Sequence, residues 1–204
     1  MTVVVVDTGV ANRHSVRNAL DYIGCKVEVT ADPQKIRAAE RLVFPGVGAF
    51  DAGMRSLRAR GLLDVLREEV IDRGKLILGI CLGLQMMAEA SEEGGMHPGL
   101  AWIPGRVRRL KPDSSDLKVP HIGFNTVAWR GGSYLFKGLP EAPDFYFLHS
   151  YCLDSTGSFV CGTVDYGGRW TVAIERDNIM GVQFHPEKSQ AAGLHLLRNF
   201  VNLS

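Results

Sequence analysis

The chain has 204 residues, of which 46% are hydrophobic and 22% are charged, and its formal net charge is +1. These values are typical of an ordinary globular protein, and residues 1–204 are predicted to form a single domain. A charge so close to zero gives no electrostatic reason to expect a nucleic acid or an anionic membrane as partner. No apolar run approaches the roughly 20 residues of a membrane span.

The first half of the chain alternates between strand and helix patterns. The predicted strands are residues 2–7, 26–30, 41–44 and 75–80, and the predicted helices are 15–23, a segment that begins at 32–33, 49–59 and 62–73. This rhythm predicts a parallel sheet with helices on both faces. Functional groups collect at the carboxyl ends of strands in such sheets, where Asp7, residues 45–48 and Cys81 lie.

The second half has shorter strand candidates that are separated by Gly, Pro, Asp and Ser. They are residues 106–110, 124–128, 145–148, 159–164, 171–175 and 180–184, and a helix over 190–201 ends the chain. Residues 94–105 are the best candidate linker, although they do not look like a boundary between independent domains. The predicted fold is therefore an α/β fold with a mostly parallel central sheet, helices on both faces and antiparallel strand additions in the second half.

The four cysteines are Cys25, Cys81, Cys152 and Cys161, and no two of them form a C-x-x-C pair. A domain of this size needs no disulfide framework, so reduced cysteines and a cytoplasmic location are expected. The His and Cys residues also lack the paired spacing of zinc ligands, so no metal site is predicted.

The segment 79–83, Gly-Ile-Cys-Leu-Gly, follows an apolar run and precedes a helix-like segment over 84–90. This is the G-x-nucleophile-x-G layout of a nucleophile elbow, with Cys81 in place of serine. A sharp strand-to-helix turn crowds the nucleophile, so the residues two before and two after it must be small. The turn also places the sulfur near a helix N-terminus, where the thiolate is favoured.

His185 and Glu187 stand two residues apart after a strand candidate that Pro186 ends. One imidazole and one carboxylate at this spacing can form a general base and the group that orients it. A histidine at a strand end is more often structural, but the cysteine elbow and the glutamate favour a catalytic set of Cys81, His185 and Glu187.

An oxyanion formed by attack of the sulfur would need preorganised N–H donors. One would be the backbone N–H of Leu82, the residue after the nucleophile. The second would come from Val47, because the glycines on either side of it let its peptide plane reorient. Taken alone, residues 45–48 are better explained as a turn that ends a strand.

The elbow, the His185–Glu187 stretch and residues 45–48 together resemble the class I, or triad-type, glutamine amidotransferases, and the resemblance covers nearly the whole chain. Within that superfamily, four stretches are similar to the glutaminase subunits of imidazole glycerol phosphate synthase, which serve histidine biosynthesis. They are residues 45–50 (PGVGAF), 79–85 (GICLGLQ), 149–151 (HSY) and 183–190 (QFHPEKSQ). Leu84 stands where the anthranilate and GMP synthase relatives usually have a histidine.

The resemblance implies that Cys81 attacks the side-chain amide of L-glutamine, that His185 protonates the leaving ammonia and that Glu187 orients His185. It assigns substrate binding to Gln85 and to main-chain groups nearby, namely those of Gly46, Gly48, Ser150 and Tyr151. No cofactor is implied. The family passes its ammonia to a cyclase subunit with a (β/α)8-barrel fold, so a heterodimer is expected.

The chain departs from the family pattern in the turn over residues 7–13, which faces the partner in the family. Asn12 and Ser15 keep their places there and are expected at the interface, but an aromatic residue and a glycine are replaced by Thr8 and Ala11. Residues 122–125 read Ile-Gly-Phe-Asn instead of Met-Gly-Trp-Asn, which keeps an aromatic side chain.

Two other functions compete with this one. The first is a free-standing cysteine hydrolase, although such enzymes usually have histidine where Leu82 stands. The second is a degenerate partner-binding module, which the intact set of candidate catalytic residues disfavours. His149 is either a second titratable group near the site or a structural anchor for the strand end before Ser150.

Overall fold

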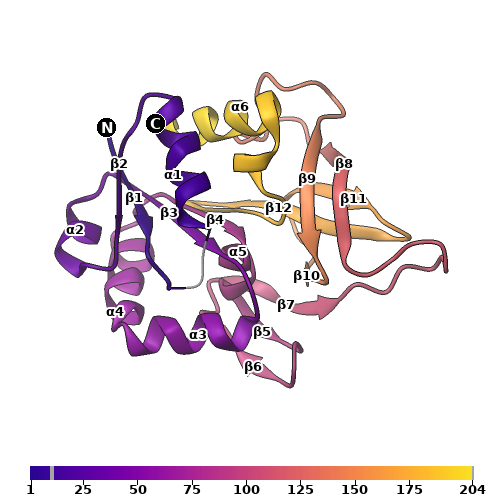
Figure 1. Cartoon of the computed structure of the whole chain (residues 1–204), viewed down its shortest axis with the longest axis horizontal. Helices are drawn as coiled ribbons and strands as arrows, with labels where there is room; N and C mark the ends of the chain where they lie inside the picture. The colour runs from indigo at the N-terminus through magenta and orange to yellow at the C-terminus, as the bar shows by residue number, and fades with distance from the viewer. Residues whose placement is uncertain (10–11, 204) are drawn as a thin grey trace.

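A nine-stranded sheet runs through the computed structural model, which describes residues 1–9 and 12–203 (Figure 1). Its strands lie in the order β2 (Lys26–Thr30), β1 (Thr2–Val6), β3 (Arg41–Gly46), β4 (Ile77–Cys81), β13 (Ile179–Val182), β12 (Arg169–Arg176), β11 (Val160–Asp165), β8 (His121–Trp129) and β9 (Asp144–His149). The pairs from β2 to β13 are parallel, and the pairs from β13 to β9 are antiparallel. The predicted fold class is thus confirmed.

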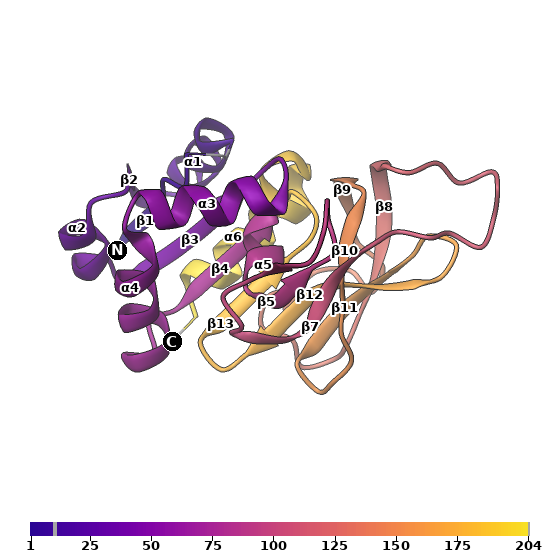
Figure 2. The same cartoon turned by 90° about the horizontal axis from the view of Figure 1, so that it is seen from below.

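Helices cover both faces of the parallel part (Figures 1 and 2). One face carries α1 (Arg13–Tyr22) and α6 (Gln190–Val201), and the other carries α2 (Pro33–Ala38), α3 (Phe50–Ala59), α4 (Leu62–Arg67) and α5 (Leu82–Met86). The side chains of β1 explain this, because successive residues of a strand point to opposite faces. Val3 and Val5 pack in the core of α1 and α6, whereas Val4 and Val6 pack in the core of the other helices.

A second, four-stranded sheet has the order β10 (Tyr151–Asp154), β7 (Ile103–Arg109), β5 (Ala88–Ser91) and β6 (His97–Pro98). Its buried side chains pack in the same hydrophobic core as those of helices α2, α3, α4 and α5. This sheet corrects two predictions. The helix expected over 84–90 ends at Met86, because residues 100–103 bond to the carbonyls of Met86, Met87 and Ala88. The expected linker over 94–105 instead contains β6 and the start of β7.

The helix expected over 62–73 forms without a break, but its hydrogen-bond pattern changes from α-helical to π-helical along its length. After α4 a π-helical turn, η1, spans Glu68–Asp72. The turn buries the side chain of Glu69, whose carboxylate lies 2.6 Å from Lys75 Nζ.

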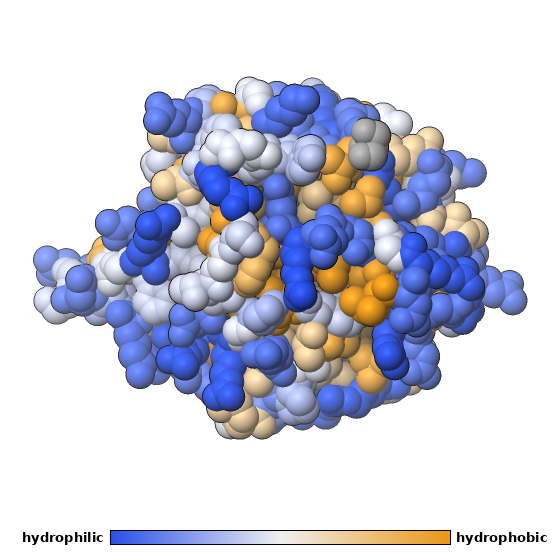
Figure 3. Space-filling model, turned by 180° about the vertical axis from the view of Figure 1, so that it is seen from behind, coloured by the Kyte–Doolittle hydropathy of each residue, from blue (hydrophilic) through white to orange (hydrophobic). Residues whose placement is uncertain are grey.

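On the side of the molecule opposite to the view of Figure 1, hydrophilic residues predominate at the rim and hydrophobic residues gather in small groups nearer the middle (Figure 3).

Candidate active site

Cys81 lies at the sharp junction between β4 and α5. Its backbone has φ 55° and ψ −111°, a conformation that L-residues rarely adopt. The glycines two positions away leave room for it: a Cβ at Gly79 would lie 2.8 Å from the Leu84 nitrogen, and one at Gly83 would overlap the carbonyl oxygen of Phe44. The expectation that these two positions must be small is therefore confirmed, and the elbow is held between β3 and the start of α5.

His185 reaches the same edge of the sheet because β13 runs parallel to β4, with Val182 in register with Ile80. Its backbone N–H donates to the Tyr146 carbonyl at 2.9 Å. A short 3₁₀ turn, η2 (Pro186–Lys188), then folds Glu187 back so that its Oε1 lies 2.9 Å from His185 Nδ1. Both side chains are almost fully buried, with 2% and 1% of their surface exposed.

The electrostatics of this cluster favour a cationic His185. Burial alone lowers the pKa of His185, but its hydrogen bonds to Cys81 and Glu187 and the negative charges of both outweigh burial and raise the pKa to about 9. Nδ1 is engaged by Glu187, so the Nε2 side faces the sulfur. The arrangement can therefore hold an imidazolium beside a thiolate, which is the form in which cysteine is nucleophilic.

A pocket of about 290 Å³ opens in front of Cys81 and His185. The site residues predicted from the sequence that line it are Val47, Gly48, Leu82, Gln85, Ser150 and Tyr151. Gly46 is not among the residues that line it and packs against Leu82, whose Cβ would lie 2.8 Å from a Cβ at Gly46. Gly48 has φ 93°, which favours glycine, and Val47 is exposed. A backbone loop at the end of β3 thus borders the pocket next to the sulfur.

A buried network of side-chain amides connects the pocket wall to the sulfur. Gln85 Nε2 donates to the Tyr151 carbonyl at 2.8 Å and to Gln183 Oε1 at 2.9 Å. Gln183 Nε2 in turn lies 3.6 Å from Cys81 Sγ. The nitrogen of Gln85, expected to bind substrate, is therefore already bonded to protein groups and fixes the Tyr151 segment.

The family assignment comes from comparison with known proteins. The model for "Glutamine amidotransferase class-I" matches residues 4–203. Imidazole glycerol phosphate synthase subunit HisH of Moorella thermoacetica is 47% identical, over 98% of this chain and 94% of that protein, and the HisH of Archaeoglobus fulgidus is 44% identical over 98% of each. The chain belongs to the class-I glutamine amidotransferases, among the HisH subunits of imidazole glycerol phosphate synthase.

Solved structures agree with this family assignment at the level of the fold. A crystal structure of a glutamine amidotransferase aligns with a TM-score of 0.75 at 18% identity, over 98% of this chain and 97% of that chain. A second glutamine amidotransferase, from Thermotoga maritima, aligns with a TM-score of 0.68 at 15% identity, over 98% and 96% of the two chains.

The turn that departs from the pattern of this family is only partly described, because Val10 and Ala11 lie outside the described residues. Thr8 is buried, and its carbonyl accepts a hydrogen bond from Ser56 Oγ at 2.5 Å. Arg13 Nη1 pairs with Asp7 Oδ2 at 2.6 Å. Thr8, which replaces the usual aromatic residue, is thus bonded to α3 through its main chain, and an ion pair between Asp7 and Arg13 joins the two ends of the turn.

The two residues expected at a partner interface lie at the start of α1. Asn12 precedes the helix and borders the same small hollow as His185 and Glu187. Ser15 is half-buried further along α1 and is not among the residues that line the pocket. Asn12 is therefore next to the site, whereas Ser15 is further from it.

Two residues at the site were missed in the sequence. Glu93 lines the pocket and is half-buried, and its Oε2 accepts the Phe50 N–H at 2.8 Å. Gln183 touches the sulfur from the strand end before His185. Gln183 stands two residues before His185, but no local pattern marks it, because its contact with Cys81 depends on the pairing of β13 with β4.

His149 has the contacts of an anchor. Its Nδ1 lies 2.9 Å from the Tyr151 carbonyl, and its Nε2 lies 3.3 Å from His121 Nδ1. Burial is the main cause that lowers the pKa of His149 to about 4, and burial also lowers the pKa of His121 to about 4. Both rings are neutral at neutral pH, and the Tyr151 carbonyl fixes the proton of His149 on Nδ1.

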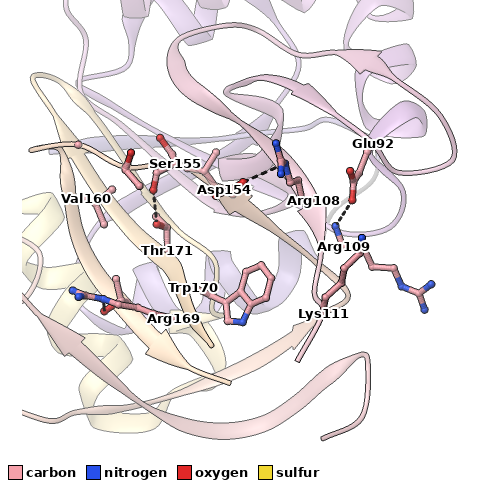
Figure 4. Close-up of a pocket in the computed structure, with 14 residues that line it drawn as sticks. Glu92, Arg108, Arg109, Lys111, Asp154, Ser155, Val160, Arg169, Trp170 and Thr171 are labelled. Carbon is pink, nitrogen blue, oxygen red and sulfur yellow. Dashed lines mark hydrogen bonds and ion pairs between the residues drawn. The ribbon is translucent and has the colours of Figure 1, made fainter. Parts of the chain in front are cut away.

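A larger cavity of about 650 Å³ lies between β7, β10 and β12 and contains none of the three candidate catalytic residues (Figure 4). Its polar groups bond mainly to one another. Arg108 pairs with Asp154 at 3.2 Å, and Glu92 accepts the backbone N–H of Arg109 at 2.9 Å. The candidate nucleophile and its base therefore face the smaller pocket and not this cavity.

Residues 1–9 and 12–203 include no group of three or more His, Cys, Asp or Glu side chains that could hold a metal ion. In the same part of the chain, no helix has the length and apolar character needed to cross a membrane.

Proposed function

We propose that this chain hydrolyses the side-chain amide of L-glutamine and delivers the ammonia to a cyclase subunit that makes imidazole glycerol phosphate in histidine biosynthesis. The observation that carries the proposal is that Cys81, on a strained elbow, and His185, which Glu187 holds by a hydrogen bond, line the same small pocket. A nucleophile, a base and a group that orients the base are the parts that acyl transfer from an amide requires.

The proposed reaction has two steps. The Cys81 thiolate attacks the amide carbon, and the protonated His185 gives its proton to the leaving ammonia as the C–N bond breaks. Neutral His185 then takes a proton from water, whose oxygen attacks the glutamyl thioester, and the C–S bond breaks to return the thiolate. The backbone N–H groups of Leu82 and Val47 stabilise the oxyanion in both steps.

The pocket is suited to the amino-acid end of glutamine. The carboxylate of Glu93 supplies a negative charge for the α-ammonium group, while its Oε2 is held by the Phe50 N–H. Main-chain groups of Gly48, Ser150 and Tyr151 border the remaining space. The volume of about 290 Å³ is that of a site for a small molecule.

The partner is proposed to be a cyclase subunit with a (β/α)8-barrel fold that docks over the pocket. Large apolar side chains stand exposed on the neighbouring strands, with Ile122 58%, Phe124 52% and Leu148 42% accessible. Leu148 also lines the pocket itself. An apolar patch that continues into a catalytic pocket is suited to a partner that receives the product.

The proposal also includes the domain organisation and the cellular location of the chain. We infer that residues 1–204 act as one glutamine amidotransferase domain, since the nine-stranded sheet takes strands from both halves of the chain. We also infer a cytoplasmic location, which the four free cysteines support.

The nucleophile is tested with Cys81→Ala. This variant should lose glutamine hydrolysis by a factor of about 10³ or more, because no thioester can form without the sulfur. The complex with the cyclase subunit should still make imidazole glycerol phosphate when ammonium salt replaces glutamine. Cys25→Ala, a change at a half-buried cysteine outside the site, is the matched control and should hydrolyse glutamine normally. Hydrolysis at the parent rate by Cys81→Ala would refute the assignment.

The docking surface is tested with Phe124→Asp. Glutaminase activity of the parent chain should be low alone and should rise when the cyclase partner and its nucleotide are added. A charge at Phe124 should weaken binding to the cyclase partner by a factor of about 10 or more in titration calorimetry, because it buries a carboxylate in an apolar contact. Tyr134→Asp, at an aromatic residue that is 59% exposed, is the control. Equal binding by both variants would place the partner elsewhere, and full activity without any partner would favour a free-standing hydrolase.

A further inference from the structure

Gln183 is fully buried and stands between the candidate nucleophile and the wall of the pocket. Its Nε2 lies 3.6 Å from Cys81 Sγ, and its Oε1 accepts the Nε2–H of Gln85 at 2.9 Å. Its backbone is held independently, because its N–H donates to the Val172 carbonyl at 2.8 Å. The side chain thus connects Cys81 to Gln85, and it takes no part in the hydrogen bonds of the sheet, which the backbone makes.

The polarity of this connection is fixed by a backbone carbonyl. The Tyr151 oxygen can only accept, so the Gln85 atom 2.8 Å away must be the NH₂ group. The same NH₂ group faces Gln183, so the atom of Gln183 that it meets must be the oxygen. Only the NH₂ group of Gln183 is then left to face the sulfur. His149 bonds to the same carbonyl through Nδ1, which further fixes its position.

We propose that Gln183 is a catalytic residue whose side-chain N–H donates to the sulfur of Cys81 and favours its thiolate form. The inference rests on the proposed glutamine hydrolysis and adds a second donor to the one that His185 provides. Cys81 is only 7% exposed, so few water molecules can solvate a negative sulfur. A donor of fixed orientation replaces that lost solvation at no cost of reorganisation during the reaction.

The same N–H acts in both steps. It stabilises the thiolate before attack, and it stabilises the sulfur again when the C–S bond of the thioester breaks and the electron pair returns to it. In the thioester between these steps the sulfur is a weak, uncharged acceptor, so the hydrogen bond is strongest when the sulfur carries charge. The bond therefore favours the charged states over the acyl-enzyme.

The experiment measures the reactivity of Cys81 directly, without glutamine. The full chain is alkylated with iodoacetamide over a range of pH, and labelling of Cys81 is followed by peptide mass spectrometry, with Cys25 as an internal reference. Two variants remove the donor: Gln183→Met keeps the volume, and Gln183→Glu keeps an acceptor for Gln85. Gln34→Glu makes the same chemical change at an exposed position and is the matched control.

In Gln183→Met the pH midpoint of Cys81 alkylation should rise by about one unit, the size expected for the loss of a charge-assisted hydrogen bond, and in Gln183→Glu it should rise further because the new carboxylate also repels the thiolate. Gln85→Met should move it in the same direction by less, because the Gln183 amide then loses its fixed orientation. The midpoint for Cys25 should not move in any variant. Thermal unfolding followed by circular dichroism identifies any variant that is not folded, and Gln85→Met then carries the test.

An unchanged midpoint in the folded Gln183 and Gln85 variants would overturn the inference. The outcome is distinct from failure of the proposed function. A parent chain that does not hydrolyse glutamine, with or without partner, would refute that function even if the alkylation midpoint shifted. Normal glutamine hydrolysis by the parent with an unshifted midpoint in the variants would refute the role of Gln183 alone.

Discussion

At the scale of single residues, the site depends on a backbone conformation that the chain adopts only under constraint. Cys81 has a positive φ without being glycine, which costs about 1–3 kcal/mol. Close packing around the elbow maintains this conformation, because Gly79 and Gly83 allow the end of β4, the start of α5 and the Phe44 carbonyl to approach closely. The glycines are therefore as much a part of the site as the side chains that line it.

Gly83→Ala tests this view. The added methyl group would overlap the Phe44 carbonyl oxygen, and backbone atoms cannot rotate away as a side chain can. We expect the free energy of unfolding to fall by about 3 kcal/mol and glutamine hydrolysis to be lost, because α5 and the sulfur must shift together. Guanidinium unfolding and a glutaminase assay measure the two effects. Gly131→Ala, at a position with open space around it, should change neither, and equal stability of the two variants would contradict the argument.

At the scale of elements, the sequence predicts best what each segment determines by itself. The continuous apolar run of β1 and the amphipathic pattern of α1 allowed the parallel half to be predicted, because both are local. The end of α5 could not be predicted in this way. Residues 100–103 bond to the carbonyls of residues 86–88, and residues 89–99 separate the two segments, so no local pattern shows the contact. Strand β10 was missed for the same reason, because it is defined by pairing with β7.

The candidate site shows the same division. Cys81, His185 and Glu187 could be found in the sequence because the elbow and the two-residue spacing are local patterns. Their meeting was an expectation that only the pairing of β13 with β4 makes possible. Gln183 carries no pattern of its own, since a glutamine at a strand end is ordinary until the sheet places it 3.6 Å from a sulfur.

At the scale of the whole molecule, the outer strands β8 and β9 of the antiparallel half are connected to the site through His149, which lines the pocket. His121 on β8 and His149 on β9 are direct cross-strand partners, and their rings bond to each other. His121 also stacks on Tyr166, with ring centroids 3.9 Å apart, and His185 is the charged group that faces His149 from the site. This part of the fold therefore requires two imidazoles to remain neutral.

That requirement predicts how stability depends on pH. His121 and His149 have pKa values of about 4 in the folded chain and about 6.5 in an unfolded chain. Between these two pH values the unfolded chain therefore binds more protons than the folded chain. The free energy of unfolding should therefore fall as the pH drops from about 6.5 towards 4, by up to about 3 kcal/mol through His149 alone.

Guanidinium unfolding at several pH values from about 4.5 to about 7.5 measures this loss across the range in which the two histidines differ from unfolded ones. Acidic residues also contribute below about pH 5, so the comparison that isolates the histidines is with His149→Asn. Asparagine can still donate to the Tyr151 carbonyl, as Nδ1 of the histidine does, but it cannot be protonated. The variant should lose less stability on acidification than the parent, whereas His14→Asn, at an exposed position, should follow the parent. Identical acid profiles for the parent and His149→Asn would show that the buried pair accepts protons without opening, and that β8 and β9 do not depend on neutral rings.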